Sequence, residues 1–496
     1  MIIYTNELPF EYELEKLTRL FFPFERVEFS YLEPDFSKDL FAVAQFKDED
    51  GKKFLIASAG LNGKVANRRT LFDDVISLDP NKDKDLERAL AVELFECYSE
   101  ITNYTPKWGI LTGIRPAKLY RKFSELIGDE KATEFFSKSF RVGDKKLELL
   151  KETAVSEDDI VLKSGKKSIS IYISIPFCPS RCSYCSFVSH SVERAANLIP
   201  EYLDYLIKEI NLTSEIVKKL GLEVMTVYIG GGTPTTLSAE QLTRLLETVH
   251  NCFGNSFDEL TVEAGRPDTI TKEKLIALKN GGVGRISINP QTMNDEVLNN
   301  IGRKHTTKQT VEAFNLAREC GFNNINMDLI AGLPGDTVES FKNTIDSIVA
   351  LNPESVTVHS LSLKRSSGMG QDKELSYLKD GIFAGEMVDY AESKLKSVGI
   401  LPYYMYRQSK TVGNLENVGY AKKGFEGLYN VYIMDETHTI LACGASAVTK
   451  LKSVSDGQIE RIFNYKYPYE YISNFDEMIE RKKRVEAFYS EHPIEN

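Results

Sequence analysis

Three cysteines lie close together in the segment YISIPFCPSRCSYCSF, residues 172–187. Cys178, Cys182 and Cys185 have C-x3-C-x2-C spacing, in a chain with seven cysteines in all. Three thiolates can hold three irons of a [4Fe–4S] cluster and leave the fourth iron open to a small molecule, whereas ferredoxin-type clusters use four protein ligands. Structural zinc is the alternative, but zinc fills four positions, and His190 is the one nearby candidate for the fourth. The spacing therefore favours the iron–sulfur cluster.

Further residues suited to ligand binding recur downstream, each at or just after a run of residues typical of a strand. The motif GGGTPTT covers 230–236, and Glu263, Gln291 and Asp328 follow later strands. The predicted strands lie near 169–175, 223–229, 259–264, 284–289, 324–330 and 355–361. Residues at the carboxyl ends of strands build the active site of α/β barrels, so we expect these residues and the cysteines to share one site.

Helices are predicted between these strands. In SAEQLTRLLETVHNCF, for example, Ser238 can cap the helix, and Leu242, Leu245 and Leu246 share one face. Six strand–helix units of this kind predict a parallel sheet with helices packed outside it. The predicted fold class is therefore α/β, with a partial (β/α)6 TIM-type barrel.

The chain divides into three predicted regions. Residues 1–165 mix strands such as LFAVAQF and KKFLIASAG with helices such as DLERALAVELFECYSEI, and form an N-terminal α/β domain. The polar segment LKSGKKS at 162–168 is typical of a linker, and the barrel occupies 166–370. Residues 371–496 contain a long helix and a tyrosine-rich segment, and are predicted to be an accessory region that covers the substrate.

Composition limits the classes of protein to which this chain can belong. Of its 496 residues, 42% are hydrophobic and 27% are charged, which is ordinary for a globular protein. No apolar run approaches the roughly 20 residues of a membrane span, and the N-terminus lacks the pattern of a signal peptide. We therefore expect a cytoplasmic protein with no membrane partner. The odd number of cysteines argues against a disulfide framework, and the net charge of −11 argues against nucleic acid as a partner.

The cysteine spacing, followed by an aromatic residue on a loop after the first barrel strand, is similar to the signature of the radical S-adenosylmethionine (SAM) superfamily. The resemblance implies two cofactors, a [4Fe–4S] cluster and S-adenosyl-L-methionine. It also implies that the open iron chelates the amino and carboxylate groups of SAM, and that reductive cleavage gives a 5′-deoxyadenosyl radical that abstracts hydrogen from substrate. In such enzymes the cofactor supplies the chemistry, while the protein positions it and excludes water.

Five motifs narrow the resemblance. In order, YISIPFC, IGGGTPT, RISINPQ, GRKHT and DLIAGLPGDT resemble the family of oxygen-independent coproporphyrinogen III oxidase, also called coproporphyrinogen dehydrogenase. The segments GILTGIRPAKLY (109–120) and YRQ…NVGY (406–420) are assigned to its clostridial and bacillar branch. The resemblance covers about residues 169–450.

The resemblance assigns roles to individual positions. Cys178, Cys182 and Cys185 match the cluster ligands, and Tyr172 matches a tyrosine near the cluster and SAM. Carboxylates suit the ammonium group and hydroxyls of SAM, and arginine suits its carboxylate. The positions that match SAM contacts are Tyr172, Gly231, Gly232, Thr233, Glu263, Gln291, Arg303, Asp328 and Ser362.

Two features depart from the family pattern. Some members have a further cysteine two residues after the third, where this chain has Phe187 after Ser186. A cluster with three protein ligands does not need that cysteine. The domain before the barrel is also longer than in the best-known members, and no role is assigned to residues 1–165.

The resemblance implies oxidative decarboxylation of two propionates of coproporphyrinogen III to vinyl groups, which gives protoporphyrinogen IX in anaerobic haem biosynthesis. The partners implied are this tetrapyrrole substrate, an electron donor such as flavodoxin or ferredoxin, and an electron acceptor that the sequence does not identify. Haem chaperones of the same family, radical SAM tetrapyrrole methyltransferases and, more distantly, RNA-modifying radical enzymes are alternatives. Ser186, where such chaperones have Asp, and NVGY without a neighbouring His or Trp favour the dehydrogenase.

Residues outside the motifs are expected to pack or to bind substrate. Coproporphyrinogen III carries four propionates, so Lys364, Arg365 and Arg407 are candidate cations for its site. The segment PYYMYRQ (402–408) is predicted to be core rather than a porphyrin platform. The residues predicted to be buried packing residues are Cys97, Cys252, Cys320, Cys443 and Trp108.

Overall fold

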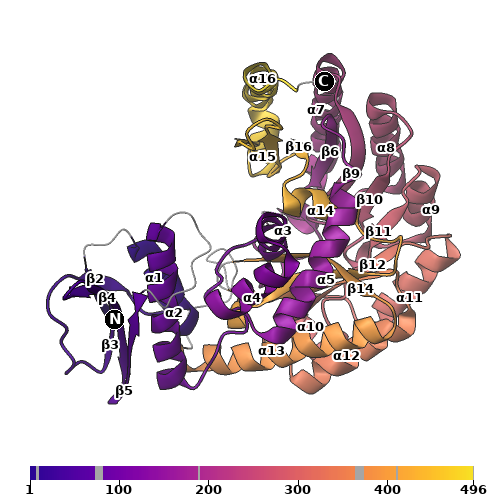
Figure 1. Cartoon of the computed structure of the whole chain (residues 1–496). Coiled ribbons are helices and arrows are strands. Elements are labelled where there is room, and N and C mark those ends of the chain that lie inside the picture. The colour runs from indigo at the N-terminus through magenta and orange to yellow at the C-terminus, as the bar shows by residue number, and fades with distance from the viewer. Residues whose placement is uncertain (7–9, 73–81, 188–189, 363–373, 409–410, 495–496) are drawn as a thin grey trace. The chain divides into compact units, whose positions relative to one another are not determined.

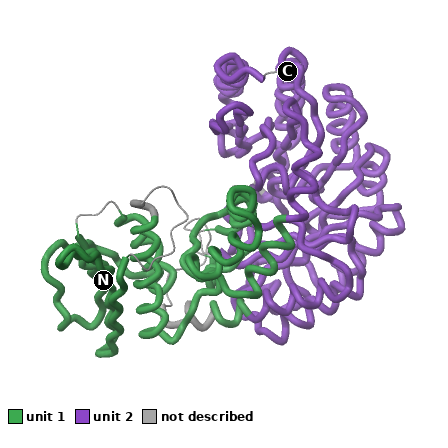
Figure 2. Tube along the Cα trace, viewed as in Figure 1, with its two compact units in different colours: residues 1–154, 371–385, 406–416 green, residues 155–370, 386–405, 417–496 purple. Residues whose placement is uncertain are grey.

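The computed structural model describes residues 1–6, 10–72, 82–187, 190–362, 374–408 and 411–494. The chain forms two compact units, drawn in green and purple in Figure 2. Unit 1 comprises residues 1–154, 371–385 and 406–416, and unit 2 comprises residues 155–370, 386–405 and 417–496. All the cysteines of the motif and all the predicted SAM contacts belong to unit 2.

Unit 1 is built on a five-stranded sheet in the order β2-β1-β3-β4-β5. Along β4, the alternate residues Leu55, Ala57 and Ala59 are fully buried, as expected for a strand with one face on a core. Helices α1 and α2 contribute Leu17 and Leu94 to the core that contains Ala57 and Ala59. The strands and helix predicted in this region are confirmed. Their bounds are β1 (Ile2–Thr5), α1 (Glu11–Phe21), β2 (Glu28–Ser30), β3 (Leu40–Glu49), β4 (Lys52–Leu61), β5 (Lys64–Leu71) and α2 (Lys82–Thr102).

Three further helices precede the barrel: α3 (Pro116–Ile127), α4 (Asp129–Ser139) and α5 (Asp144–Val161). Helix α3 begins with proline, whose missing N–H costs nothing in the first turn. Phe123 of α3 and Phe135 of α4 stack with their ring centroids 5.0 Å apart, which holds these two helices together. Helix α5 ends directly before the predicted linker at 162–168, and the first barrel strand begins at Ser168.

Unit 2 contains the predicted partial (β/α)6 barrel. Six strands follow one another in chain order, and each is parallel to the next. They are β6 (Ser168–Ile175), β9 (Glu223–Gly231), β10 (Glu259–Glu263), β11 (Arg285–Ser287), β12 (Ile325–Ala331) and β13 (Ser355–Ser360). The intervening helices follow one another along the outer side of these strands (Figure 1). They are α7 (Ile199–Leu220), α8 (Ala239–Phe253), α9 (Lys272–Asn280), α10 (Asp295–Asn300), α11 (Thr307–Glu319) and α12 (Val338–Leu351).

Helix α8 illustrates why these segments fold as predicted. The Ser238 hydroxyl accepts from the Gln241 N–H, and the Gln241 side chain accepts from the Ser238 N–H, which completes a capping box. Leu242, Leu245 and Leu246 are buried on one face of the helix. Both predictions for this segment are confirmed. Among the described residues, no helix combines the length and apolarity needed to cross a membrane.

The C-terminal residues extend the barrel sheet at both edges. Strand β15 (Glu416–Ala421) pairs antiparallel with β13, and β16 (Thr439–Cys443) pairs parallel with β6. The full order is β14-β15-β13-β12-β11-β10-β9-β6-β16-β17-β18.

The other elements are the pair β7 (Phe177–Cys178) and β8 (His190–Ser191), α6 (Val192–Ala195), α13 (Glu374–Ser397), β14 (Leu401–Arg407), α14 (Leu428–Asp435), β17 (Val448–Lys452), β18 (Ile459–Phe463), α15 (Pro468–Ser473) and α16 (Phe475–Glu491).

The compact units differ from the three predicted regions. Two stretches of the predicted accessory region, 371–385 and 406–416, belong to unit 1, and the rest of it belongs to unit 2 together with the barrel. An open sheet exposes unpaired backbone groups at its edges, and the C-terminal strands pair with those groups. The predicted role of this region in covering the substrate stays a prediction.

A buried carboxylate ties the C-terminal helices of unit 2 to the barrel. Glu209 of α7 is 0% exposed and accepts hydrogen bonds from the Gly444 N–H at 2.7 Å, Asn464 Nδ2 at 2.9 Å and the Tyr471 hydroxyl at 2.5 Å. Lys482 Nζ of α16 lies 3.0 Å from the same carboxylate. The negative charge of Glu209 is therefore fully matched by donors within unit 2.

A second buried carboxylate lies in unit 1. Glu416 accepts from Trp108 Nε1 at 2.6 Å and from Lys146 Nζ at 2.7 Å. Arg407 lies over the Trp108 ring, is 3% exposed, and donates to the carbonyl oxygens of Leu111 and Asn414. Arg407 is thus a buried cation held by backbone of unit 1, its Nε has no partner among the described residues, and its binding of a propionate stays a prediction. Its place among tyrosines in the sequence gave no sign of these distant backbone partners.

Candidate active site

The three cysteines lie on one loop that begins at the carboxyl end of β6. Residues 179–187 of this loop contain no helix or strand. Contacts to the segment after α10 hold it in place: the Ser183 N–H donates to Ile301 O at 3.0 Å, and Ser180 Oγ donates to Gly302 O at 3.0 Å. The irregular loop is therefore fixed by hydrogen bonds to a distant part of the chain.

The cysteine sulfurs have polar and charged neighbours. Thr233 Oγ1 donates to Cys178 Sγ at 3.5 Å, and Arg266 Nη1 donates to Cys182 Sγ at 3.9 Å. Burial raises the pKa of the Cys185 thiol, and the neighbouring thiols of Cys182 and Cys178 raise it further. The electrostatic effect on Cys185 thus comes from the two other cysteines of the motif.

The arrangement does not suit a single metal ion. Among the described residues, no group of three or more His, Cys, Asp or Glu side chains is placed to hold one ion. His190, the candidate fourth zinc ligand, lies instead beside the rings of Tyr467 and Tyr469, at centroid separations of 5.6 and 6.1 Å. In a [4Fe–4S] cluster each thiolate binds a different iron, so the sulfurs need not converge on one point. The loop therefore fits the cluster better than zinc.

Glycines bring the end of β9 against the cysteine loop. A Cβ atom on Gly232 would lie 2.6 Å from Phe177 O and 3.0 Å from Cys178 Sγ, so no larger residue fits there. Gly231 has a φ of +106°, which L side chains rarely adopt. The Thr233 N–H donates to Phe177 O at 2.7 Å. Gly232 and Thr233 thus lie beside the cysteine loop, and the contacts of all three residues with SAM stay a prediction.

Glu263, the last residue of β10, lies beside a group of three stacked tyrosines. The Tyr228 hydroxyl donates to Glu263 Oε1 at 2.5 Å, and the Tyr228 ring stacks on Tyr429 of α14 with centroids 4.6 Å apart. Tyr172 stacks against both rings at 6.3 Å. Burial and the nearby Asp328 raise the pKa of Glu263 to about 7, against the opposing hydrogen bond from Tyr228. The charge of this carboxyl therefore changes near neutral pH.

Gln291 and Asp328 are joined through the backbone. Gln291, with a φ of 69°, donates its N–H to Asp328 O at 2.9 Å and accepts from the Ile330 N–H at 3.0 Å. Asp328 lies within β12, and its Oδ1 accepts from Asn326 Nδ2 at 2.7 Å. Two backbone bonds thus hold Gln291 in a conformation that is uncommon for a residue with a side chain.

Arg303 lies beneath the cysteine loop and is 6% exposed. Its Nη1 donates to Asn289 O at 2.5 Å, and its Nη2 donates to the hydroxyl of Tyr184, a residue of the loop, at 3.2 Å. Burial lowers the pKa of the Arg303 guanidinium, but Tyr184 and Cys182 outweigh burial and hold that pKa above its usual value. Arg303 is therefore charged at every working pH.

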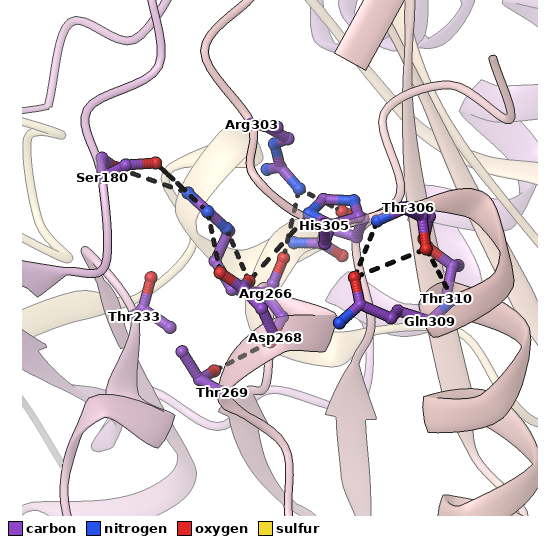
Figure 3. A network of polar contacts seen from close by, with 12 residues as sticks. Ser180, Thr233, Arg266, Asp268, Thr269, Arg303, His305, Thr306, Gln309 and Thr310 are labelled. Atoms are coloured by element: carbon purple, nitrogen blue, oxygen red, sulfur yellow. Dashed lines mark hydrogen bonds and ion pairs between the residues drawn. The ribbon is translucent and has the colours of Figure 1, made fainter. Parts of the chain in front are cut away.

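Sequence analysis missed Arg266, Asp268 and His305. Figure 3 shows the Arg266 guanidinium between Ser180 and Asp268, with His305 beside Arg303. Burial and the positive charges of Arg303 and Arg266 lower the pKa of His305 to about 3. The available signal was position: EAGRPDT begins with the predicted carboxylate at the end of its strand, and GRKHT contains the predicted arginine. Such polar residues also suit a surface loop, and only the contacts distinguish the two.

The structure also shows the position or burial of several other residues named in the predictions. Ser362 lies two residues beyond β13, while Lys364 and Arg365 lie outside the described residues. Tyr403 and Tyr404 are buried, which confirms the core prediction for this segment. The predicted packing residues found buried are Cys97, Cys252, Cys443 and Trp108, whereas Cys320 is half-buried.

The residues of the site fit SAM. Gln291 Oε1, Arg303 Nε and Ser174 Oγ are buried and have no hydrogen-bond partner within the described part of the chain. Because buried polar atoms are normally paired, such atoms mark places where a ligand completes the bonding. The charges also match, since Glu263 and Asp328 suit an ammonium group and hydroxyls, and Arg303 suits a carboxylate.

Comparison with known proteins supports this chemistry. The family described as "Radical SAM superfamily" matches residues 172–348. The oxygen-independent coproporphyrinogen-III oxidase-like protein HemZ of Bacillus subtilis (strain 168) is 41% identical over 386 residues, 77% of this chain and 77% of the relative.

Two further relatives have different names. The heme chaperone HemW of the same Bacillus subtilis strain is 35% identical over 281 residues, 56% of this chain and 70% of the relative. The oxygen-independent coproporphyrinogen III oxidase of Escherichia coli (strain K12) is 34% identical over 199 residues, 40% of this chain and 43% of the relative.

The extent of the similarity to HemZ establishes the family, and the matched region contains the cysteine loop. The cofactors of the superfamily, a [4Fe–4S] cluster and SAM, are therefore the cofactors of this protein. The chain belongs to the radical SAM superfamily and, within it, to the family of oxygen-independent coproporphyrinogen III oxidase-like proteins.

Proposed function

We propose that this protein converts coproporphyrinogen III to protoporphyrinogen IX by oxidative decarboxylation of two propionates, without oxygen. Each vinyl group requires removal of one hydrogen atom from the propionate β-carbon, loss of CO2 and transfer of one electron to an acceptor. When bound, the cluster and SAM supply the abstraction of hydrogen. A flavodoxin or ferredoxin is the proposed electron donor, and the proposed setting is the cytoplasm.

The observation that supports this substrate most strongly is the 41% identity over 386 residues to a protein named coproporphyrinogen-III oxidase-like. That similarity extends over 77% of the chain, whereas the similarity to the Bacillus chaperone extends over 56%. The longer match to the oxidase-like protein favours its named substrate over the role of the chaperone.

The roles of individual residues follow from their positions. Cys178, Cys182 and Cys185 each hold one iron on the fixed loop. Gly231, Gly232 and Thr233 bring backbone close to that loop, where the Gly232 position tolerates no Cβ atom. The residues proposed to hold SAM are Tyr172, Gly231, Gly232, Thr233, Glu263, Gln291, Arg303, Asp328 and Ser362.

The charged residues of the site are proposed to bind different groups of SAM. Glu263 and Asp328 accept from its amino N–H groups and ribose hydroxyls, and Arg303 donates to its carboxylate. The Arg303 Nε and Gln291 Oε1 atoms, which lack partners in the described residues, gain them when SAM binds. Tyr172 packs beside Tyr228 and Glu263 and excludes water from one side of the site.

A haem chaperone is the second candidate, because this chain is 35% identical to HemW over 281 residues. Ser186 between Cys185 and Phe187 favours the oxidase over this candidate. A radical SAM tetrapyrrole methyltransferase is a third possibility that the same experiment separates.

The experiment uses anaerobically reconstituted protein, SAM, a low-potential reductant and coproporphyrinogen III. The expected products are protoporphyrinogen IX and two molecules of CO2 for each substrate, and none from Cys182→Ala protein. Stable haem binding without turnover would instead identify a chaperone. A methylated tetrapyrrole with consumption of SAM would identify a methyltransferase.

A further inference from the structure

Arg266 connects the end of β10 with the cysteine loop. Its Nε and Nη2 donate to the two carboxylate oxygens of Asp268, both at 3.1 Å, in a bidentate pair. Its Nη1 and Nη2 donate to Ser180 Oγ, both at 3.2 Å, and its Nη1 donates to Cys182 Sγ at 3.9 Å. Arg266 is 3% exposed, so this charge is buried among groups of the protein itself.

The hydrogen bonds of Arg266 distinguish it from Arg303. A guanidinium has five N–H donors, and in Arg266 all three nitrogens have partners on Asp268 or the cysteine loop. In Arg303, Nε has no partner within the described residues. Both arginines therefore act on the cysteine loop, but Arg303 keeps a donor for a ligand, whereas all three nitrogens of Arg266 are committed to protein groups.

The charge of Arg266 bears on the electron that the cluster accepts. Reduction adds one negative charge to a cluster, and its potential depends on net charge and on hydrogen bonds to sulfur. A buried cation that donates to a ligand sulfur stabilises the reduced form more than the oxidised form. Asp268, on the other side of the guanidinium, opposes this effect by its charge while it holds the guanidinium in place.

We propose that Arg266 is a positioning residue that orients Cys182 and, together with Asp268, sets the reduction potential of the cluster. This inference goes beyond the proposed function, because it concerns the cluster whichever substrate is used. It rests on Cys182 as a cluster ligand, which iron analysis of Cys182→Ala protein tests separately.

The test is an anaerobic redox titration of the reconstituted cluster without SAM, followed by EPR of the reduced form. In Arg266→Gln protein we expect the ratio of reduced to oxidised cluster at a fixed potential to fall at least tenfold, a downward shift of about 59 mV for one electron. Arg266→Lys keeps the charge and should recover at least half of that shift.

Asp268→Asn makes the test more specific, because it should shift the reduction potential in the direction opposite to that of Arg266→Gln. Loss of the carboxylate charge should raise the potential, whereas a merely loosened loop would shift both variants the same way. Arg318→Gln is the control, since Arg318 lies on α11 and pairs with Glu354 at 2.8 Å, and its partners in the described part of the chain do not include Cys182 or the cysteine loop. An unchanged potential in Arg266→Gln, or shifts of the same sign in Arg266→Gln and Asp268→Asn, would overturn the proposal. If Arg266→Gln does not take up iron, the sign of the Asp268→Asn shift decides.

Discussion

Two buried charged regions of unit 2 differ in how completely their polar groups are paired. Around Glu209, the carboxylate is matched by Gly444, Asn464, Tyr471 and Lys482. At the proposed SAM site, in contrast, Gln291 Oε1 and Arg303 Nε are buried and have no partner within the described residues. The first region consists of charges that complete one another, and the second leaves donors and acceptors free.

The difference separates structural charge from charge that serves a ligand. A buried ion without a partner is costly, so a chain retains one only where binding repays that cost. Burial alone would not make this distinction, since Lys482 and Arg303 are 3% and 6% exposed. Mutations in the two regions should therefore act on different measurable quantities.

The largest effect is expected at the cysteine loop. Cys182→Ala removes the ligand of one iron, so the [4Fe–4S] absorbance and the bound iron should be lost after reconstitution. Cys178→Ala and Cys185→Ala should do the same. Cys252→Ala is the matched control, because Cys252 lies on α8 and its Sγ donates to Asn211 Oδ1 at 3.4 Å. Full iron occupancy in Cys182→Ala protein would show that the ligands are assigned wrongly.

The next largest effect is expected on the stability of the protein, from a substitution in the region around Glu209. Lys482→Met leaves the Glu209 carboxylate buried without its cation, and should lower the free energy of unfolding by about 3–5 kcal/mol. Urea denaturation of the apo-protein measures this loss. Arg303→Met should cost far less, because the arginine it removes is only partly paired. Equal losses of stability in the two variants would contradict the contrast between the regions.

For the affinity of SAM, we expect a larger effect from a substitution of Arg303 than from one of Lys482. Arg303→Gln removes a charge-assisted hydrogen bond to the SAM carboxylate, worth about 1.5–3 kcal/mol, so affinity should fall about ten- to a hundredfold. Calorimetric titration of reconstituted protein with SAM measures the change. Lys482→Met protein that still folds should bind SAM as the unmodified protein does. Unchanged SAM affinity in Arg303→Gln would assign the carboxylate to another donor.

Much of the barrel could be predicted because its signals are local. Alternating strands and amphipathic helices depend on neighbouring residues, and strands β6 and β12 begin within a residue of their predicted starts. Cys182, Glu263 and Arg303 were predicted because each follows a strand or stands in a recognisable motif. The structure places Arg303 against the cysteine loop and Glu263 against β9, and their roles toward cluster and SAM stay predictions.

Features that depend on distant partners could not be predicted. Arg407 finds its carbonyl acceptors on Leu111 and Asn414, so its sequence neighbours gave no measure of its burial. Tyr429 joins the stack at Tyr228 only because the C-terminal strands extend the barrel sheet. The positive φ of Gln291 likewise depends on backbone bonds to β12.

The smallest effect expected here is a pH dependence of SAM binding that originates at Glu263. Its pKa is raised from 4.5 to about 7, chiefly by burial and then by Asp328, so in the SAM-free protein the carboxyl is largely neutral at pH 6 and largely ionised at pH 8. Hydrogen bonds from the amino N–H groups and ribose hydroxyls of SAM favour the ionised form, so binding should release a proton and strengthen as pH rises. Between pH 6 and pH 8 the affinity should rise about tenfold, or about 1.4 kcal/mol.

Two variants show whether Glu263 is the titrating group. Glu263→Gln should bind SAM more weakly at pH 8 and lose most of the pH dependence, because the amide does not titrate. Tyr228→Phe removes the hydrogen bond that lowers the pKa of Glu263, so the midpoint of the pH dependence should move to higher pH. Calorimetry at several pH values, in buffers of different ionisation enthalpy, measures both the affinity and the released proton. A SAM affinity that is constant from pH 6 to pH 8 in the unmodified protein would mean that Glu263 is already ionised in the free site, and that the unpaired groups around Arg303 determine binding without it.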